Sequence, residues 1–241
     1  MISKSLRPLP EKWHGLQDIE ERFRRRYLDT LMNEEVKEKL VFRIRMIEEI
    51  RNFYNNNGFL EVEVPQLQPL AGGATAKPFL THHNALDTDF YLPIAQELYL
   101  KMLLVGGFNK VYELGRRFRN EGIDTMHNPE FTMLESNEAY VDAKSQRDFI
   151  EKLFKYVVKN LFKKMTIIYD NQKINFSKKF AVYTFYDLLK RYALIPNPHE
   201  ITQKDAIIRA KQLNVDVKAT DSLENILDDI YKKTCRPKLI Q

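Results

Sequence analysis

YELGRRFRNEGIDTMHNPEFTMLE, residues 112–135, is the stretch that decides the fold. Tyr112 and Leu114 alternate with charged side chains, which is the pattern of a half-buried strand. The segment 122–129 then gathers Gly, Asp, Asn and Pro, which favour a loop. From Glu130 the chain alternates again. The stretch therefore predicts an antiparallel strand–loop–strand hairpin with one apolar face and one polar face.

The polar face of this hairpin carries residue types that suit a nucleoside triphosphate. Arginine donates planar, bidentate hydrogen bonds to phosphate, each contributing roughly 1.5–3 kcal/mol. An aromatic ring at Phe131 offers a stacking surface for a purine. Glu121, two residues after Arg119, could accept from an adenine amino group or hold the arginine in place. The alternative interpretation is a charged hairpin with solvated arginines.

The whole stretch resembles motif 2 of the class II aminoacyl-tRNA synthetases, and its FRNEG and HNPEFT strings are similar to the lysyl branch of that family. The resemblance spans residues 3–180 and continues more weakly to the end. Three further stretches carry it, namely LRPLPEKWHGLQDIEERFRRRYLD (6–29), GFLEVEVPQLQPLAGGATAKPFLTHHNALD (58–87) and QELYLKMLLVGGFNKVYELGRRFRNEG (96–122).

This resemblance implies an α+β fold, with an antiparallel sheet flanked by helices and a helical C-terminal insertion. The implied function is ATP-dependent activation of lysine and its attachment to tRNA(Lys). In that reaction the lysine carboxylate attacks the α-phosphate of ATP in line, and pyrophosphate leaves. Such an enzyme supplies positioning and charge stabilisation rather than covalent chemistry.

The resemblance also assigns roles to single residues. Arg119 is the candidate catalytic residue, which bridges the α-phosphate and the lysine carboxylate. The implied ATP-binding residues are Arg119, Glu121, His127, Asn128 and Phe131. The implied lysine-binding residues are Gly73, Glu97, Glu135 and Asn137.

Three positions depart from the family pattern. Asn137 stands where lysyl enzymes usually have tyrosine, and Pro93 and Gln96 replace the usual arginine and proline. Since Glu135 and Asn137 share the parity of Phe131, their side chains are expected to face one pocket. The shorter Asn137 removes apolar wall, so we expect lysine to remain the preferred amino acid but to bind more weakly than in the family.

The chain is expected to comprise three parts. Residues 1–17 are a linker, residues 18–181 a partial catalytic core, and residues 182–241 a helical insertion. Within the core, motif 1 covers about 36–65 and motif 2 about 110–138. In 36–65 a long amphipathic helix precedes a short strand. In the family that helix forms a homodimer interface; an ordinary core helix is the alternative.

Shorter patterns predict further elements. Spacings typical of a capping box begin at Ser145, Thr184 and Thr202, and each predicts a helix start. The segment 166–176 is expected to form a hairpin that turns at Asp170-Asn171. Arginines in the helical segment 18–31 are either a solvated face or a contact for the tRNA backbone.

Composition narrows the class of partner and compartment. A net charge of +5 and a pI near 9.0 favour an anionic partner. One cysteine, Cys235, excludes an internal disulfide and suits a reducing cytoplasm. The first 13 residues lack the apolar core of a signal peptide, and no apolar run reaches the roughly 18 residues of a membrane span. All eight glycines lie at or before Gly122, which excludes a glycine-rich phosphate loop in the second half.

The family completes its site with acidic magnesium ligands and a glycine-rich motif 3, and neither is found in this sequence. We therefore expect the Mg²⁺ ligands to lie beyond this chain, no metal ligand within it, and no anticodon-binding domain. An internal fragment of this kind is expected to have low stability, to tend to associate, and to show little or no catalysis alone. The alternatives are a core-only paralogue that acts on a protein acceptor, and an inactive RNA-binding or dimerising remnant.

Overall fold

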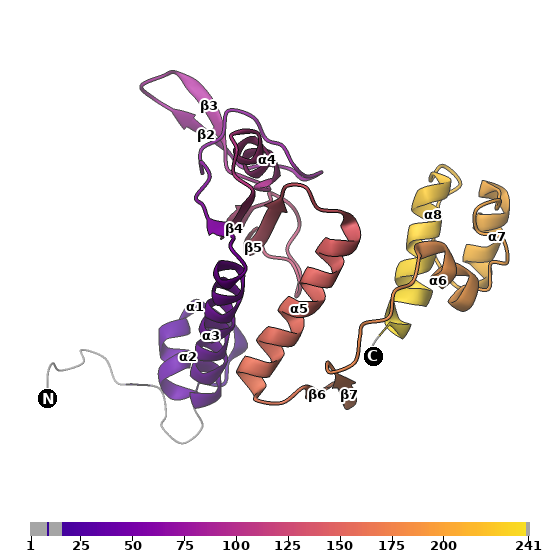
Figure 1. The fold of residues 1–241 in the computed structure, drawn as a ribbon, viewed down its shortest axis with the longest axis horizontal. Coiled ribbons are helices and arrows are strands. Elements are labelled where there is room, and N and C mark those ends of the chain that lie inside the picture. Colours follow the sequence, from indigo (N-terminus) through magenta and orange to yellow (C-terminus); the bar gives the residue numbers. More distant parts are fainter. Residues whose placement is uncertain (1–8, 10–15, 240–241) are drawn as a thin grey trace, which may run out of the picture. The chain divides into compact units, whose positions relative to one another are not determined.

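The structure is a computed structural model that describes Leu9 and residues 16–239 (Figure 1). The predicted linker therefore lies outside the described residues, apart from Leu9, Leu16 and Gln17. The chain forms two compact units, the first ending at Leu161 and the second beginning at Phe162. No helix among the described residues has the length and apolarity needed to cross a bilayer.

The predicted hairpin is present and lies in the middle of the first unit. Strand β4 (Lys110–Phe118) pairs antiparallel with β5 (Glu130–Glu138), from Lys110 opposite Glu138 to Phe118 opposite Glu130. The short strand β1 (Leu60–Glu61) joins the other edge of β4 in parallel, giving the order β1-β4-β5. Alternation along the sequence favours this register, because a slip by one residue would move Tyr112, Leu114 and Leu134 from the face that packs in the aromatic cluster to the opposite face.

Helices cover the apolar face of the hairpin. The long helix α3 (Glu34–Asn56) and helix α5 (Ala143–Phe162) contribute aromatic and aliphatic side chains to one cluster with β4 and β5. Tyr54 of α3 stacks on Tyr112 of β4 with ring centroids 4.7 Å apart. The buried members of this cluster are Phe53, Tyr54, Phe59, Tyr112 and Leu153.

Helix ends in this unit follow local rules, with two corrections to the sequence expectations. The expected single helix 18–31 is divided into α1 (Ile19–Arg24) and α2 (Arg26–Met32), because Arg25 leaves the helical conformation at φ −119° and ψ 55°. Helix α5 begins two residues before Ser145, since the Asp142 carboxylate accepts from the Ser145 N–H at 2.8 Å and caps the helix earlier. Helix α3 ends as expected, with Gly58 in the left-handed region at φ +79°.

The remaining elements of the first unit surround the polar face. Strands β2 (Leu80–His83) and β3 (Thr88–Tyr91) form a second antiparallel hairpin. Helix α4 (Glu97–Val105) follows, and Leu100 packs with Val64 and Val111 in a smaller apolar cluster. This packing sets the start of α4 beside the polar face of β4 and β5.

The second unit holds a small hairpin and a group of helices. The hairpin β6 (Thr166–Tyr169) and β7 (Gln172–Asn175) turns at Asp170 and Asn171, both with positive φ, as the sequence predicts. Helices α6 (Phe185–Tyr192), α7 (Gln203–Gln212) and α8 (Leu223–Ile230) enclose their own core, and Thr184 and Thr202 cap the first two as expected. A π-helical turn (Tyr231–Cys235) and a 3₁₀ turn (Arg236–Lys238) continue α8.

Candidate functional site

Register determines which side chains meet on the polar face. In an antiparallel pair, residues directly opposite each other project to the same side of the sheet. Arg117 lies opposite Phe131, and Glu113 lies opposite Glu135. The aromatic cluster with α3 occupies the other side of the sheet. The predicted charged residues are therefore gathered on one face, away from the core.

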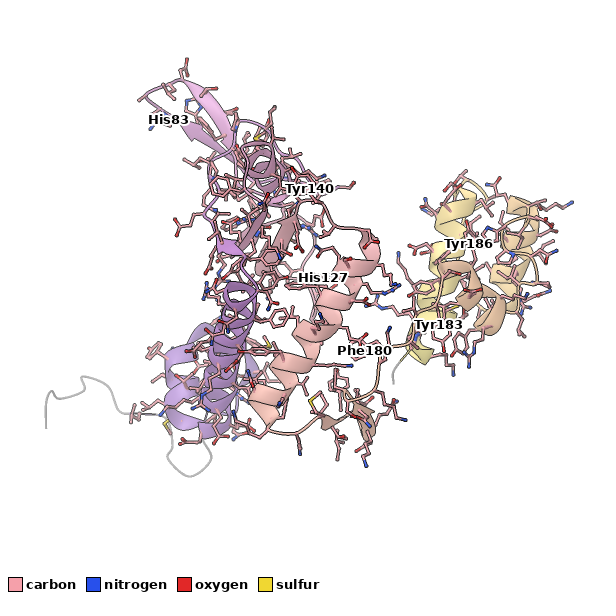
Figure 2. All side chains as sticks on the ribbon, viewed as in Figure 1. His83, His127, Tyr140, Phe180, Tyr183 and Tyr186 are labelled. Atoms are coloured by element: carbon pink, nitrogen blue, oxygen red, sulfur yellow. The ribbon has the colours of Figure 1, made fainter. Side chains whose placement is uncertain are left out.

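A pocket of about 210 Å³ lies where the hairpin loop folds over the end of this face. The structure brings the five predicted ATP-binding residues together in its wall, although they span 13 positions from Arg119 to Phe131. His127, in the loop that joins the two strands, is labelled in Figure 2. The residues that line the pocket are Arg119, Glu121, Gly122, Met126, His127, Asn128 and Phe131.

The backbone N–H of Arg119 is hydrogen-bonded, whereas one nitrogen of its side chain has no hydrogen-bond partner. Its N–H donates to the Pro129 carbonyl at 2.8 Å, so the base of the loop is closed. Its guanidinium carbon lies 5.2 Å from the centroid of the Phe131 ring, within cation–π range. Its Nε is buried and has no hydrogen-bond partner. A buried donor of this kind is costly unless a ligand or water meets it, so the arrangement is suited to binding an anion beside an aromatic face.

The loop between the strands is held by its own polar contacts. The Asp124 carboxylate accepts from the Met126 N–H at 2.6 Å and from the His127 N–H at 2.8 Å. His127 Nδ1 lies 2.8 Å from the same carboxylate, and this hydrogen bond is the main reason that the pKa of Asp124 lies below its usual value. Glu121 accepts from the Lys77 N–H at 3.3 Å, which ties the loop to the segment before β2.

The predicted lysine-binding residues begin at a close contact between Gly73 and helix α4. Gly73 has φ +84°, and a Cβ at this position would lie 3.1 Å from the Glu97 Cβ and 3.2 Å from the Ala95 Cβ. Glycine is therefore required here on both counts. Glu97 is the first residue of α4, and its carboxylate forms an ion pair with Lys101 one turn later.

Glu135 differs from the other carboxylates of this face. Burial raises its pKa, the negative charge of Glu97 adds to this effect, and the backbone N–H of Gln96 and the charges of Arg117 and Arg119 oppose it. Among residues 9 and 16–239, no cation lies within ion-pair distance of Glu135. A partly buried carboxylate without an ion-pair partner is a binding position for a ligand cation.

Asn137 is the fourth predicted lysine-binding residue. It lies on β5 two residues after Glu135 and directly opposite Val111. Val111 is fully buried. Gly73, Glu97 and Glu135 are linked by contact or by charge, whereas Asn137 is linked to them through the shared face of the strand.

Sequence reasoning did not single out the ion pair beneath this site. The Arg117 side chain is 0% exposed and donates to Glu113, which also accepts from the Val64 N–H at 3.2 Å. Burial raises the pKa of Glu113, although the charge of Arg117 opposes this. One residue of the sequence could have indicated this pair. Gly115 lies between Glu113 and Arg117 on the same side of the strand, and it has no side chain. A Cβ on Gly115 would come within 3.3 Å of both charged groups.

Unpaired buried atoms gather at the same place. In the described part of the chain, the buried side-chain nitrogen and oxygen atoms without a hydrogen-bond partner are Gln96 Oε1, Arg117 Nε and Arg119 Nε. Gln96 precedes α4 and donates to the Met133 carbonyl of β5 at 3.4 Å. Such atoms are rare in folded proteins and require an explanation. Their position beside the predicted site supports a polar ligand there.

Metal binding has no support from these side chains. Among the described residues, no group of three or more His, Cys, Asp or Glu side chains is placed to hold a metal ion. His82 contacts Asp89 at 2.9 Å and Asp87 at 3.5 Å as an exposed ion-pair group on the β2–β3 hairpin. The residues present therefore do not fit a magnesium site.

Comparison with known proteins gives a consistent result. A family model described as tRNA synthetases class II (D, K and N) matches residues 18–236. The whole chain is 46% identical to a lysine–tRNA ligase of Moorella thermoacetica and 48% identical to one of Syntrophomonas wolfei, each covered over 49% of its length. It is 44% identical to a lysine–tRNA ligase of Bacillus cytotoxicus, covered over 48%. The chain thus spans about half the length of these curated relatives.

Proposed function

The chain belongs to the class II tRNA synthetases (D, K and N), and we propose that it carries part of the active site of a lysine–tRNA ligase, which activates lysine with ATP and attaches it to tRNA(Lys). The observation that carries this proposal is one continuous polar face. An arginine–aromatic pocket lies at one end, and an unpaired carboxylate lies four residues along β5.

The pocket of Arg119 and Phe131 is assigned to ATP. Phe131 supplies a stacking surface for adenine, and Glu121 accepts from the adenine amino group. Arg119 meets the charge that develops at the α-phosphate, and its free Nε is available for this purpose. His127 and Asn128 close the loop over the nucleotide. A preorganised donor of this kind lowers the barrier because it needs no reorganisation during the reaction.

The neighbouring carboxylates are assigned to the amino acid. The lysine carboxylate attacks the α-phosphorus, the bond to the β-phosphate breaks, and pyrophosphate leaves. In this arrangement Glu135 and Glu97 face the two ammonium groups of lysine. Gly73 lies in close contact with Glu97, and Asn137 extends the same wall of the pocket. Two carboxylates favour lysine over aspartate or asparagine, the other substrates in the family description, because an aspartate side chain is repelled by like charge and the neutral asparagine amide leaves one of the two carboxylates unpaired.

Several features extend this proposal beyond the site. We assign residues 18–181 to the catalytic core and residues 182–241 to a helical insertion. A homodimer forms through α3, whose Leu40 and Ile44 are exposed apolar side chains. Magnesium accompanies ATP in the family, but the described residues do not fit a magnesium site. The location that suits tRNA aminoacylation is the cytoplasm.

The direct test is ATP–pyrophosphate exchange on the 241-residue chain. Lysine is expected to support exchange, and aspartate, asparagine, arginine and ornithine are expected to support little. Exchange with one of these four and not with lysine would overturn the assignment of the substrate. Lysine titrations of the Asn137→Tyr variant test the wall of the pocket, since restoring the ring is expected to tighten lysine binding. An unchanged affinity would exclude Asn137 from the pocket.

A further inference from the structure

The second unit holds a feature that the synthetase site does not use. A pocket of about 410 Å³ lies against helix α6 and the end of the α8 segment. Tyr183, just before α6, is labelled in Figure 2. Three of its seven lining residues are tyrosines, one is a lysine, and none is a carboxylate. These residues are Ala181, Tyr183, Leu188, Tyr192, Tyr231, Lys238 and Leu239.

Cations flank the aromatic rings of this pocket. The Arg191 guanidinium carbon lies 5.6 Å from the Tyr183 ring centroid and 5.2 Å from that of Tyr192, and Arg191 donates to the Tyr183 hydroxyl at 3.3 Å. Lys238 lines the pocket itself. In the part of the chain that the structure describes, neither Arg191 nor Lys238 has a carboxylate within ion-pair distance. Both positive charges are therefore available to an anion.

The charge of the chain is concentrated in the same unit. Residues 162–241 contain 15 Lys and Arg against 9 Asp and Glu, whereas residues 1–161 contain 23 against 24. The net charges are therefore +6 and −1. The unit without the predicted catalytic residues thus carries the basic surface, which the chemistry of lysine activation does not require.

We infer that this pocket, defined by Tyr183, Tyr192, Tyr231 and Lys238, binds an unpaired base of single-stranded RNA, with Arg191 and Lys238 meeting the adjoining phosphates. Aromatic rings that accept the face of any base, together with cations along the backbone, are the usual features of single-strand recognition. Leu188, which is buried, adds an apolar side chain to the lining. Duplex RNA keeps its bases paired and stacked, so it gains the electrostatic attraction but not the stacking.

The test measures binding of a fluorescein-labelled single-stranded RNA oligonucleotide, and of the same strand in a duplex, to the full 241-residue chain. The single strand is expected to bind more tightly. Tyr183→Ala is expected to weaken single-strand binding about fivefold or more, since one base–aromatic stack contributes roughly 1–3 kcal/mol. Tyr183 is 47% exposed and outside the buried core of the unit, so this variant is expected to fold. Tyr183→Phe keeps the ring and is expected to bind as the wild type does.

Matched controls separate the pocket from general attraction. Tyr169→Ala removes an exposed tyrosine of the same unit outside the pocket, and Lys204→Ala removes an exposed lysine on α7. Tyr169→Ala is expected to leave single-strand affinity unchanged. Lys238→Ala is expected to weaken binding more than Lys204→Ala and to reduce the salt slope by about 0.7. Equal affinity for single strand and duplex, or equal losses in Tyr183→Ala and Tyr169→Ala, would overturn the inference.

This inference fails or survives separately from the proposed function. Tyr183→Ala is expected to leave ATP–pyrophosphate exchange unchanged, because the residues assigned to that reaction belong to the other unit. A chain that exchanges pyrophosphate but binds RNA without regard to Tyr183 would retain the ligase proposal and lose this one. A chain that shows no exchange but loses single-strand binding in Tyr183→Ala would do the reverse.

Discussion

Three carboxylates lie on or beside the polar face of the central hairpin, and their environments differ. Glu97 pairs with Lys101, and Glu113 pairs with the buried Arg117. Glu135 is partly buried and has no such partner among the described residues. An unpaired charge in this setting costs several kcal/mol, which folding alone gives no reason to accept. Of the three, Glu135 is therefore the carboxylate with no cation of the described chain within ion-pair distance.

Arg119→Ala is predicted to lower ATP–pyrophosphate exchange by about 10²–10³, because it removes one preorganised donor from the developing charge. Arg116→Ala is the matched control, since Arg116 is a neighbouring arginine on β4 that projects to the opposite face and is half exposed. This control is expected to keep most of its activity. If Arg119→Ala retains more than half of the wild-type rate, the role given to Arg119 is wrong.

Glu135→Gln is predicted to stabilise the chain at neutral and higher pH while weakening lysine binding. Because burial raises the pKa of Glu135, the folded chain keeps this proton to a higher pH than the unfolded chain, whose value is about 4.3. The free energy of unfolding therefore falls as pH rises through that interval. The variant lacks this loss and is expected to be more stable than the wild type at neutral pH.

Urea unfolding at neutral pH and below the unfolded pKa measures this difference, which is expected to vanish in acid because Glu135 is then protonated in both states. Glu130→Gln, at the exposed end of the same strand, is the control and is expected to leave the stability at neutral pH nearly unchanged. A Glu135→Gln variant that is less stable than the wild type at neutral pH would show that the carboxylate has a structural partner.

At the level of elements, the hairpin is a platform whose two faces have separate tasks. Its apolar face packs against α3 and α5, and its polar face presents the predicted site residues. The buried pair Glu113–Arg117 sits in that polar face, and Gly115 leaves room above it. The same strand therefore supplies core and site, so a change in packing beside Gly115 reaches the site directly.

Gly115→Ala is predicted to destabilise the first unit by roughly 1–3 kcal/mol, the usual cost of overpacking. The added Cβ would lie 3.3 Å from both Arg117 and Glu113, and neither group is free to move, because each is buried and bonded. Gly122→Ala is the matched control: its Cβ would meet nothing within 4 Å, so little effect is expected. Thermal unfolding compares the two, and equal melting temperatures would show that the ion pair relaxes freely.

Sequence patterns predicted this platform well because its determinants are local. Alternation set the pairing of residues 110–138, and the capping residues Thr184 and Thr202 set two helix starts. Two helix boundaries depended on a competition between neighbouring residues that the sequence pattern does not show. Asp142 caps α5 ahead of Ser145, and Arg25 interrupts the first helical segment. Both are single-residue choices that propensity does not resolve.

Only part of the candidate site could be predicted from the sequence. One string of sequence contains all the proposed ATP-binding residues, so their gathering in one pocket followed from the hairpin alone. The burial of Arg117 did not follow, because parity shows which face an arginine shares and not how deeply it lies. The contact between Gly73 and Glu97 joins residues 24 positions apart, and only the family resemblance linked them beforehand.

At the scale of the whole molecule, the two units differ in net charge and in the sites that are proposed for them. The unit ending at Leu161 is nearly neutral and contains the proposed site for ATP and lysine, whereas the unit from Phe162 carries the net positive charge. Apolar surface is also unevenly distributed. Ile19, Phe23, Tyr27 and Leu31 recur every four residues along α1 and α2 and are all strongly exposed. Four large apolar side chains are thus exposed within 13 residues of this segment.

Exposed apolar side chains on α3 lead to the prediction that the chain is a homodimer and that Ile44→Glu dissociates it. Ile44 is 62% exposed, and in a two-fold interface each substitution acts twice. The dissociation constant is expected to rise about thirtyfold or more, corresponding to roughly 2 kcal/mol at one central contact. Ile168→Glu, at an equally apolar position 78% exposed on β6, is the control and is expected to leave the dimer intact. Sedimentation equilibrium measures both; a monomeric wild-type chain, or equal dissociation by the two variants, would contradict an interface on α3.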